Sequence, residues 1–114
     1  MIRHSIKKIK PYGNDEEINA FIIDPPYEEL NIIKGISDLG DLDLEIEWIK
    51  ELINRNVPDY TQDGFIIYQP FLWGSRKSKI GEINDNKIIG AREFDTKEFL
   101  DLCYAWKQFL KANI

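Results

Sequence analysis

The residues of this chain whose types could support chemistry are mostly carboxylates. Asp38, Asp41, Asp43 and Glu45 lie close enough in sequence to supply an acid–base pair or the oxygen ligands of a magnesium ion. The stretch from Asp38 to Glu51 lacks the glycine and glutamate spacing of an EF-hand loop. The chain also has no phosphate-binding loop, dinucleotide fingerprint, GxSxG elbow or zinc signature. We therefore predict no catalytic residue, no metal and no cofactor, and a protein that is not an enzyme.

Two other side chains with catalytic potential each occur once. His4 is the only histidine, which excludes a two-histidine metal site, and its basic surroundings favour a solvated surface position. Cys103 is the only cysteine and lies on the apolar stripe of a predicted helix, which favours packing over a nucleophilic role. A single cysteine excludes an internal disulfide, and this favours a reducing compartment.

A short basic cluster stands beside an aromatic residue. Arg76, Lys77 and Lys79 follow Trp73, which is the combination of bases and aromatic groups that contacts nucleic acid. Three charges in one turn are more often a solvated loop. We therefore expect no direct contact with nucleic acid.

The acidic residues are segregated along the chain. Fourteen of the twenty lie between Asp15 and Asp63, against three bases, so this window has a formal charge of −11. Residues 1–14 carry +4, and residues 64–114 carry +2, eight bases against six acids. Such segregation produces a local potential that steers oppositely charged partners. We expect a basic protein partner, because nucleic acid needs bases to displace its counterions.

Apolar and aromatic side chains interrupt the acidic charge between residues 38 and 63. Leu44, Trp48 and Tyr60 could anchor an interface, because binding hot spots favour large side chains surrounded by charges that govern encounter and partner choice. A solvated helix face is the alternative. The predicted partner-binding residues are Asp41, Asp43, Leu44, Glu47, Trp48, Glu51, Asp59, Tyr60 and Asp63.

The elements that must position these residues begin with two strands. Basic residues separate Ile2, Ile6 and Ile9, and a Pro-Tyr-Gly turn follows at 11–13, which predicts an edge-like strand. Residues 18–23 read as its partner strand. A short helix starting at Asn14 is the alternative, and we favour the strand.

Two helices are predicted next. Asp24 and two prolines mark the N-cap and first turn of a short helix over residues 25–35. Over residues 41–56 an alternating strand-like pattern competes with helical spacing, and the length and the good helix formers favour a helix. Its expected apolar stripe consists of Leu42, Ile46, Ile49 and Ile53.

The C-terminal half begins with strand patterns. The apolar run over residues 65–68 predicts a central strand that Pro70 ends, and residues 71–74 predict an edge or bulged continuation. Residues 79–83 and 87–91 flank an Asn-Asp-Asn segment, which indicates a hairpin.

The last helix, expected over residues 96–111, has the clearest start signal. Asp95 at the N-cap and Glu98 at N3 make a capping-box pattern, and Phe94 before the cap can pack against Phe99. Its predicted buried stripe consists of Phe99, Cys103, Trp106 and Leu110.

Together these elements predict one α+β domain over residues 1–114. We expect an antiparallel or mixed sheet of about four or five strands, packed against three helices. The sheet would join the N-terminal strand pair to strands from residues 64–91. No apolar run approaches the roughly 20 residues of a membrane span, and no signal-peptide pattern occurs, so a cytoplasmic protein without membrane contact is expected.

Small size, acidity and the C-terminal phrase FDTKEFLDLCYAWKQFLKAN resemble immunity proteins of bacterial polymorphic-toxin and contact-dependent growth-inhibition systems. These families share no single fold or binding motif, so the resemblance transfers no site residue. It implies a cytoplasmic antitoxin that neutralises a cognate toxin, often a nuclease, by protein–protein interaction. With the acidic window, this predicts a basic RNase or DNase domain as partner. The alternatives are a small carboxylate-dependent enzyme, an acidic DNA mimic and a structural subunit.

Overall fold

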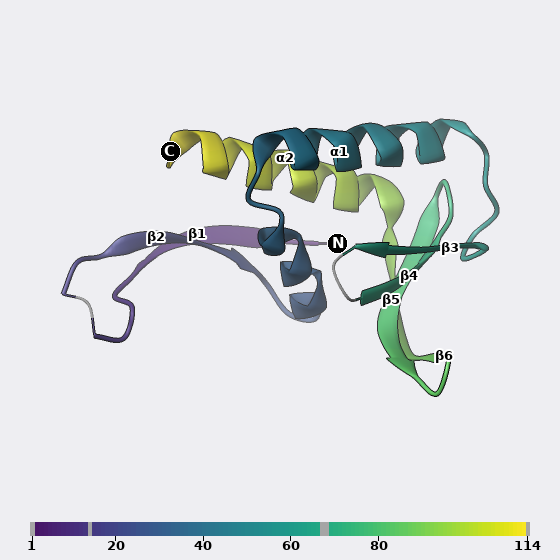
Figure 1. The fold of residues 1–114 in the computed structure, drawn as a ribbon, viewed down its shortest axis with the longest axis horizontal. Helices are drawn as coiled ribbons and strands as arrows, with labels where there is room; N and C mark the ends of the chain where they lie inside the picture. Colours follow the sequence, from purple (N-terminus) through teal and green to yellow (C-terminus); the bar gives the residue numbers. More distant parts are fainter. Residues whose placement is uncertain (1, 14, 67–68, 114) are drawn as a thin grey trace.

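The structure is a computed structural model, and it describes residues 2–13, 15–66 and 69–113. It is α+β, as predicted, with two antiparallel sheets and three helices (Figure 1). No helix within the described ranges combines the length and the apolar character that a membrane crossing needs. The elements are β1 (His4–Ile9), β2 (Ile18–Ile23), the 3-10 helix η1 (Glu28–Gly35), α1 (Leu39–Asn54), β3 (Gln62–Ile66), β4 (Gln69–Trp73), β5 (Lys77–Asn84), β6 (Lys87–Asp95) and α2 (Thr96–Ala112).

The two long helices lie on one side of the molecule and both sheets lie on the other. Figure 1 shows α1 and α2 side by side and running in opposite directions, with the ribbon β1–β2 under one end of the pair and the sheet β3–β6 under the other. The 3-10 helix η1 lies between the two sheets. The resulting body is elongated, with extents of 48 × 30 × 23 Å.

The N-terminal strand pair forms a sheet of its own, so the prediction that it joins the strands of residues 64–91 is wrong. β1 and β2 pair antiparallel, with His4 opposite Ile23 and Ile9 opposite Ile18. Lys34 of η1 donates from Nζ to the backbone oxygen of Phe21 at 2.7 Å. This bond from η1 covers the outer edge of β2 at Phe21.

The larger sheet has the order β3-β4-β5-β6, which reverses two of the predicted strand roles. β3 is an edge strand, whereas the run over residues 65–68 predicted a central one; residues 67–68 lie outside the described part of the chain. β4 is interior, because Phe71 pairs with Gly64 on one side and with Ile80 on the other. Pro70 stands near the start of β4, opposite Phe65, where a missing backbone donor is tolerated.

The predicted hairpin is confirmed as β5 and β6. Asp85 and Asn86 form its two-residue turn with φ angles of 50° and 62°, which is the left-handed pair of a type I′ turn. A register shift between Ile80 and Glu82 marks a bulge in β5. The hairpin reaches beyond the rest of the sheet (Figure 1).

The helices cover the sheet through an aromatic core. Phe71 and Trp73 stack with ring centroids 4.5 Å apart, and Phe94 and Phe99 meet them at tilted or perpendicular angles. All four side chains are buried. On α1 the predicted apolar stripe is confirmed at Leu42, Ile46 and Ile49. At its C-terminal end Leu52 is buried, and the predicted Ile53 is only partly buried. On α2 the buried residues are Thr96, Phe99, Leu102, Cys103 and Trp106, and Leu110 is only partly buried.

Two predicted helix starts are wrong in detail. Asp24 is not a cap, because its N–H still bonds to the backbone oxygen of Arg3 at 2.8 Å as part of the ribbon, and η1 begins only at Glu28. Asp95 does occupy the N-cap position of α2, but its side chain makes no capping bond. It forms an ion pair with Lys77 of β5 instead.

The capping-box partner also binds elsewhere. Glu98 accepts a hydrogen bond from the backbone N–H of Ile2 at 3.4 Å. At the start of α2, the N–H of Thr96 donates to the backbone oxygen of Arg76 at 3.0 Å, so tertiary contacts satisfy a group that local capping leaves open. The predicted contact between Phe94 and Phe99 is confirmed, with ring centroids 5.6 Å apart.

Candidate partner-binding surface

The outer face of α1 gathers five of the predicted partner-binding residues. Asp38 caps the helix, because its side chain accepts from the N–H of Asp41 at 3.0 Å. Leu42 and Ile46 are buried on the inner side, so residues half a turn away project to solvent. We call this exposed surface the acidic face. It consists of Asp41, Asp43, Leu44, Glu47 and Glu51.

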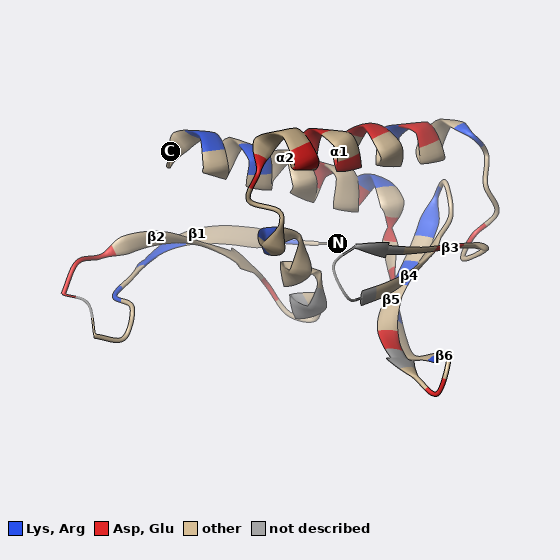
Figure 2. Cartoon of the chain, in the orientation of Figure 1, with Lys and Arg blue, Asp and Glu red and all other residues tan. Residues whose placement is uncertain are grey.

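Leu44 is the apolar part of the acidic face. Its side chain is 71% exposed, and no other residue of this face is apolar. Figure 2 shows acidic positions repeated along α1. In the sequence Leu44 lies between Asp43 and Glu47 of this face. An exposed leucine among carboxylates offers a partner apolar contact area, and the carboxylates around it produce a negative electrostatic potential.

Cations from nearby positions neutralise part of this charge. Lys107 of α2 pairs with Asp43 at 2.5 Å, and Lys50 pairs with Glu47 at 3.4 Å. The carboxylate of Glu47, and then the Tyr104 hydroxyl, raise the pKa of Lys50. Among the described residues Asp41 and Glu51 have no ion-pair partner. The acidic face is therefore less negative than the sequence window suggests.

Trp48 lies at the border between the acidic face and the core. It is partly buried, and its ring meets that of Trp73 edge-on, with centroids 5.2 Å apart. This packing supports the aromatic core and leaves one part of the ring accessible. Its role as a binding anchor stays a prediction, and its replacement would also cost stability.

Asp59 and Tyr60 lie in a second cluster of mixed charge. Asp59 is 3.5 Å from Arg76, and the Tyr60 hydroxyl bonds to Glu93 of β6. Lys79 of β5 lies over the Tyr60 ring, 4.3 Å from its centroid. The loop after α1 therefore attaches Tyr60 to β5 and β6, away from the outer side of α1.

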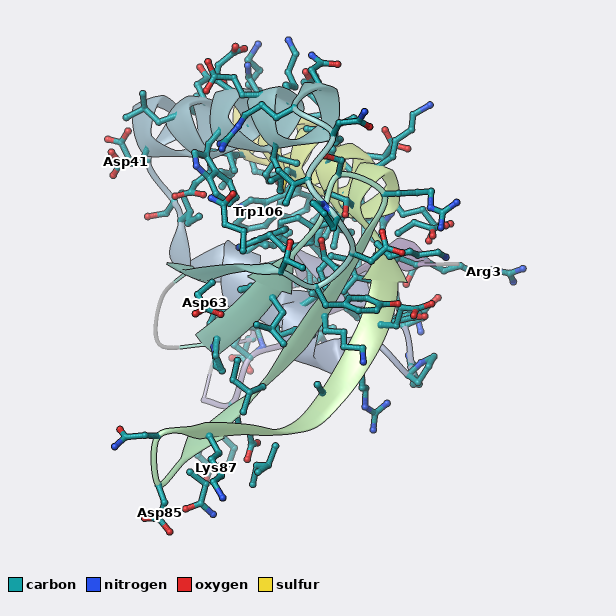
Figure 3. The ribbon with its side chains drawn as sticks, turned by 90° about the vertical axis from the view of Figure 1, so that its right-hand side faces the viewer. Arg3, Asp41, Asp63, Asp85, Lys87 and Trp106 are labelled. Atoms are coloured by element: carbon teal, nitrogen blue, oxygen red, sulfur yellow. The ribbon has the colours of Figure 1, made fainter. Side chains whose placement is uncertain are left out.

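Asp63 lies on β3 and is exposed. Figure 3 shows Asp63 on the same side of the molecule as Asp41, below the start of α1, with Trp106 in the interior. Asp63 also lines a cavity of about 250 Å³, together with residues that include Asn86 and Lys87. It extends the acidic side of the molecule beyond α1.

The structure thus brings together the residues of the acidic face and separates them from Asp59 and Tyr60. Three cations from the C-terminal half contact predicted binding residues, which the sequence did not indicate: Lys107 at Asp43, Arg76 at Asp59 and Lys79 at the Tyr60 ring. The sequence predicts Arg76 and Lys79 to lie in a solvated loop, whereas both contact residues of the segment after α1. Nothing in the local sequence indicates that Lys107 meets Asp43, because that contact depends on the packing of α1 against α2.

Cys103 and Glu45 lose hydration in the fold, and His4 packs against an aromatic ring. Burial, and then the negative charge of Glu45, raise the pKa of the Cys103 thiol to about 12, so it is protonated at neutral pH and a poor nucleophile. Burial likewise raises the pKa of Glu45. His4 stacks on Phe21 with ring centroids 4.8 Å apart. Within residues 2–13, 15–66 and 69–113, no group of three or more His, Cys, Asp or Glu side chains could hold a metal ion.

No protein-family model, curated protein or solved structure matches this chain.

Proposed function

We propose that this chain is a non-catalytic immunity protein, which binds and neutralises a cognate basic toxin domain, an RNase or a DNase, through the acidic face of α1. One observation carries the proposal: Leu44 is 71% exposed in a face that also presents Asp41, Glu47 and Glu51. The leucine supplies apolar contact area, and the carboxylates steer a cationic partner and set its orientation.

The mode of action follows from the charge of a nuclease groove. Such a groove holds phosphates with Lys and Arg side chains. A protein surface that presents carboxylates to the same cations occupies the groove and excludes the substrate. Inhibition is then steric and electrostatic, and this chain carries out no reaction. We further propose that it acts in the cytoplasm, where a single free thiol such as that of Cys103 stays reduced.

The test is capture of the partner from the host that makes this protein. The tagged chain is incubated with host lysate, washed at low salt and eluted at high salt, and the eluate is examined by mass spectrometry and by a nuclease assay. We expect one basic protein whose nuclease activity appears on elution and disappears when the chain is added back.

Two triple variants with the same net charge locate the surface. The first carries Asp41→Lys, Glu47→Lys and Glu51→Lys; Asp43 is left in place because its reversal would also break the pair with Lys107. The control variant carries Asp15→Lys, Glu82→Lys and Asp101→Lys, which are exposed positions outside α1. Both should melt within a few degrees of the unmodified protein.

The first variant should lose capture of the nuclease, and the control should retain it. Equal capture by both would reject the acidic face as the binding surface. Recovery of several unrelated DNA-binding proteins would instead support a DNA mimic, and it would contradict a cognate toxin as partner.

A further inference from the structure

The ribbon β1–β2 has two long edges, and only one of them is covered. Asp24 donates to the backbone oxygen of Arg3, which makes these two residues a hydrogen-bonded pair of the antiparallel ladder. Paired and unpaired positions alternate along such a ladder. His4, Ile6 and Lys8 therefore direct their backbone N–H and C=O groups away from β2.

The two edges differ in what faces them. On the β2 side, Lys34 of η1 bonds to the outward oxygen of Phe21. On the β1 side, no described residue bonds to the outward groups of His4, Ile6 and Lys8. An uncovered strand edge of this kind is a template for pairing with another chain.

The side chains along β1 define which strand would fit. Arg3, Lys7, Lys8 and Lys10 are exposed, and none of them forms an ion pair with a described residue. In Figure 2 these bases mark the ribbon, and Figure 3 shows Arg3 projecting away from the side that carries Asp41. This positive edge is therefore distinct from the acidic face.

Exposed apolar side chains lie among these bases. Ile6 is 56% exposed and Ile9 is 42% exposed, and Ile18, opposite Ile9 on β2, is 46% exposed. A phosphate backbone has no groups to cover such side chains and no alternation of donors and acceptors to match the strand edge. Asp15 and Glu17 at the turn end of the ribbon would also repel phosphates.

We propose that the outer edge of β1 is a strand-addition site for an extended segment of a partner protein, in which acidic residues alternate with apolar ones. Backbone pairing would supply affinity, and the side chains would supply selectivity. Because successive side chains of a strand point to opposite faces, the acidic residues would lie beside Arg3 and Lys7 on one face, and the apolar residues would lie beside Ile6 on the other. This inference does not depend on the proposed toxin partner.

The probe is the synthetic peptide acetyl-Glu-Val-Glu-Ile-Glu-Val-Glu-amide, added to the full chain labelled for NMR. A peptide with lysine in place of glutamate is the charge control. At saturation we expect amide hydrogen exchange at Ile6 and Lys8 to slow at least tenfold. The amide of Lys7, already bonded to β2, should change little and serves as the internal control.

Chemical blocking of the peptide backbone tests strand pairing directly. Two further peptides carry N-methyl groups on alternate amides, one set on each edge of the extended peptide. One of the two should bind as the parent does, and the other should bind at least tenfold more weakly, because only one edge faces β1. Equal weakening of both would contradict strand addition.

Substitutions in this chain, in place of changes to the peptide, test the same site. Ile6→Pro removes an outward N–H without removing a bond to β2, and it should weaken binding at least tenfold. Lys7→Glu with Lys8→Glu should do the same. The matched control, Lys97→Glu with Lys111→Glu on α2, makes the same net charge change and should bind normally.

Several outcomes would overturn the inference: no binding at millimolar peptide, equal binding of the lysine peptide, slowed exchange elsewhere than on β1, or preference for an oligonucleotide of equal charge. The triple variant of the acidic face should bind the peptide normally. Failure of this site and failure of the proposed function are therefore distinguishable.

Discussion

Folding partly buries the carboxyl group of Glu45 on the flank of α1, and this loss of hydration raises its pKa. Its charge also contributes, after burial, to the raised pKa of the Cys103 thiol in α2. The carboxylate is disfavoured in the folded protein relative to the unfolded chain. The stabilisation that protonated Glu45 provides is fully present below its unfolded pKa and is lost as pH rises through the higher folded value.

Glu45→Gln should therefore increase the free energy of unfolding at pH 7, where the native protein must hold a partly desolvated charge. We expect a gain below about 1 kcal/mol, because solvent still screens a partly exposed group. The gain should shrink toward zero near pH 4. Urea unfolding at both pH values measures it, and Glu51→Gln on the exposed side should change stability by less than ~0.5 kcal/mol at either pH. An equal gain at both pH values would attribute the effect to packing instead.

At the scale of elements, α1 and α2 both begin after an aspartate, and the two aspartates act differently. Asp38 caps α1, because its side chain accepts a hydrogen bond from the N–H of Asp41. Asp95 precedes α2 but turns to Lys77, since β5 and β6 bring that lysine close. The position of each helix could be predicted from its sequence, because spacing and flanking residues are local. The partner of Asp95 could not, because it comes from another strand.

This difference predicts two distinct responses to alanine. Asp38→Ala should cost ~1 kcal/mol of stability, the usual cost of a lost N-cap, with little dependence on salt. Asp95→Ala should cost about 0.5 kcal/mol at low salt and less at 1 M salt, because it removes a partly exposed ion pair. Thermal melts at two salt concentrations separate the two cases. A large, salt-independent loss for Asp95→Ala would show that it caps α2 after all.

At the scale of the whole molecule, the ribbon is joined to the helices through a small set of aromatic contacts. Phe21 of β2 lies 5.4 Å from the ring of Trp106 and 5.7 Å from that of Phe109, measured between centroids. Trp106 also donates from Nε1 to the backbone oxygen of Ile36 at 2.9 Å, which fixes the segment between η1 and α1. A two-stranded sheet is marginal by itself. The ribbon therefore depends on this attachment.

Phe21→Ala should release the ribbon while the larger sheet stays folded. Truncating a buried phenylalanine costs about 3–5 kcal/mol, which is more than a two-stranded ribbon can supply. Amide exchange should accelerate strongly at Ser5 and Lys7 and change much less at Phe71 and Ile80. Ile18→Ala, at an exposed position of the same strand, is the control and should leave exchange nearly unchanged. Uniform acceleration in both sheets would indicate one cooperative unit.

The sequence by itself determined the α+β class, the approximate range of each helix, the hairpin with its turn at Asp85 and Asn86, and the inner stripe of α1. These features depend on residues a few positions apart, through spacing, capping and turn chemistry. Only the tertiary structure decided that the strands divide into two sheets and that β3 is an edge. It also decided which acids stay uncompensated, because Lys107 reaches Asp43 only when α1 and α2 pack together. The charge of a surface is set by side chains that fold together from distant parts of the chain, and a window of sequence cannot count them.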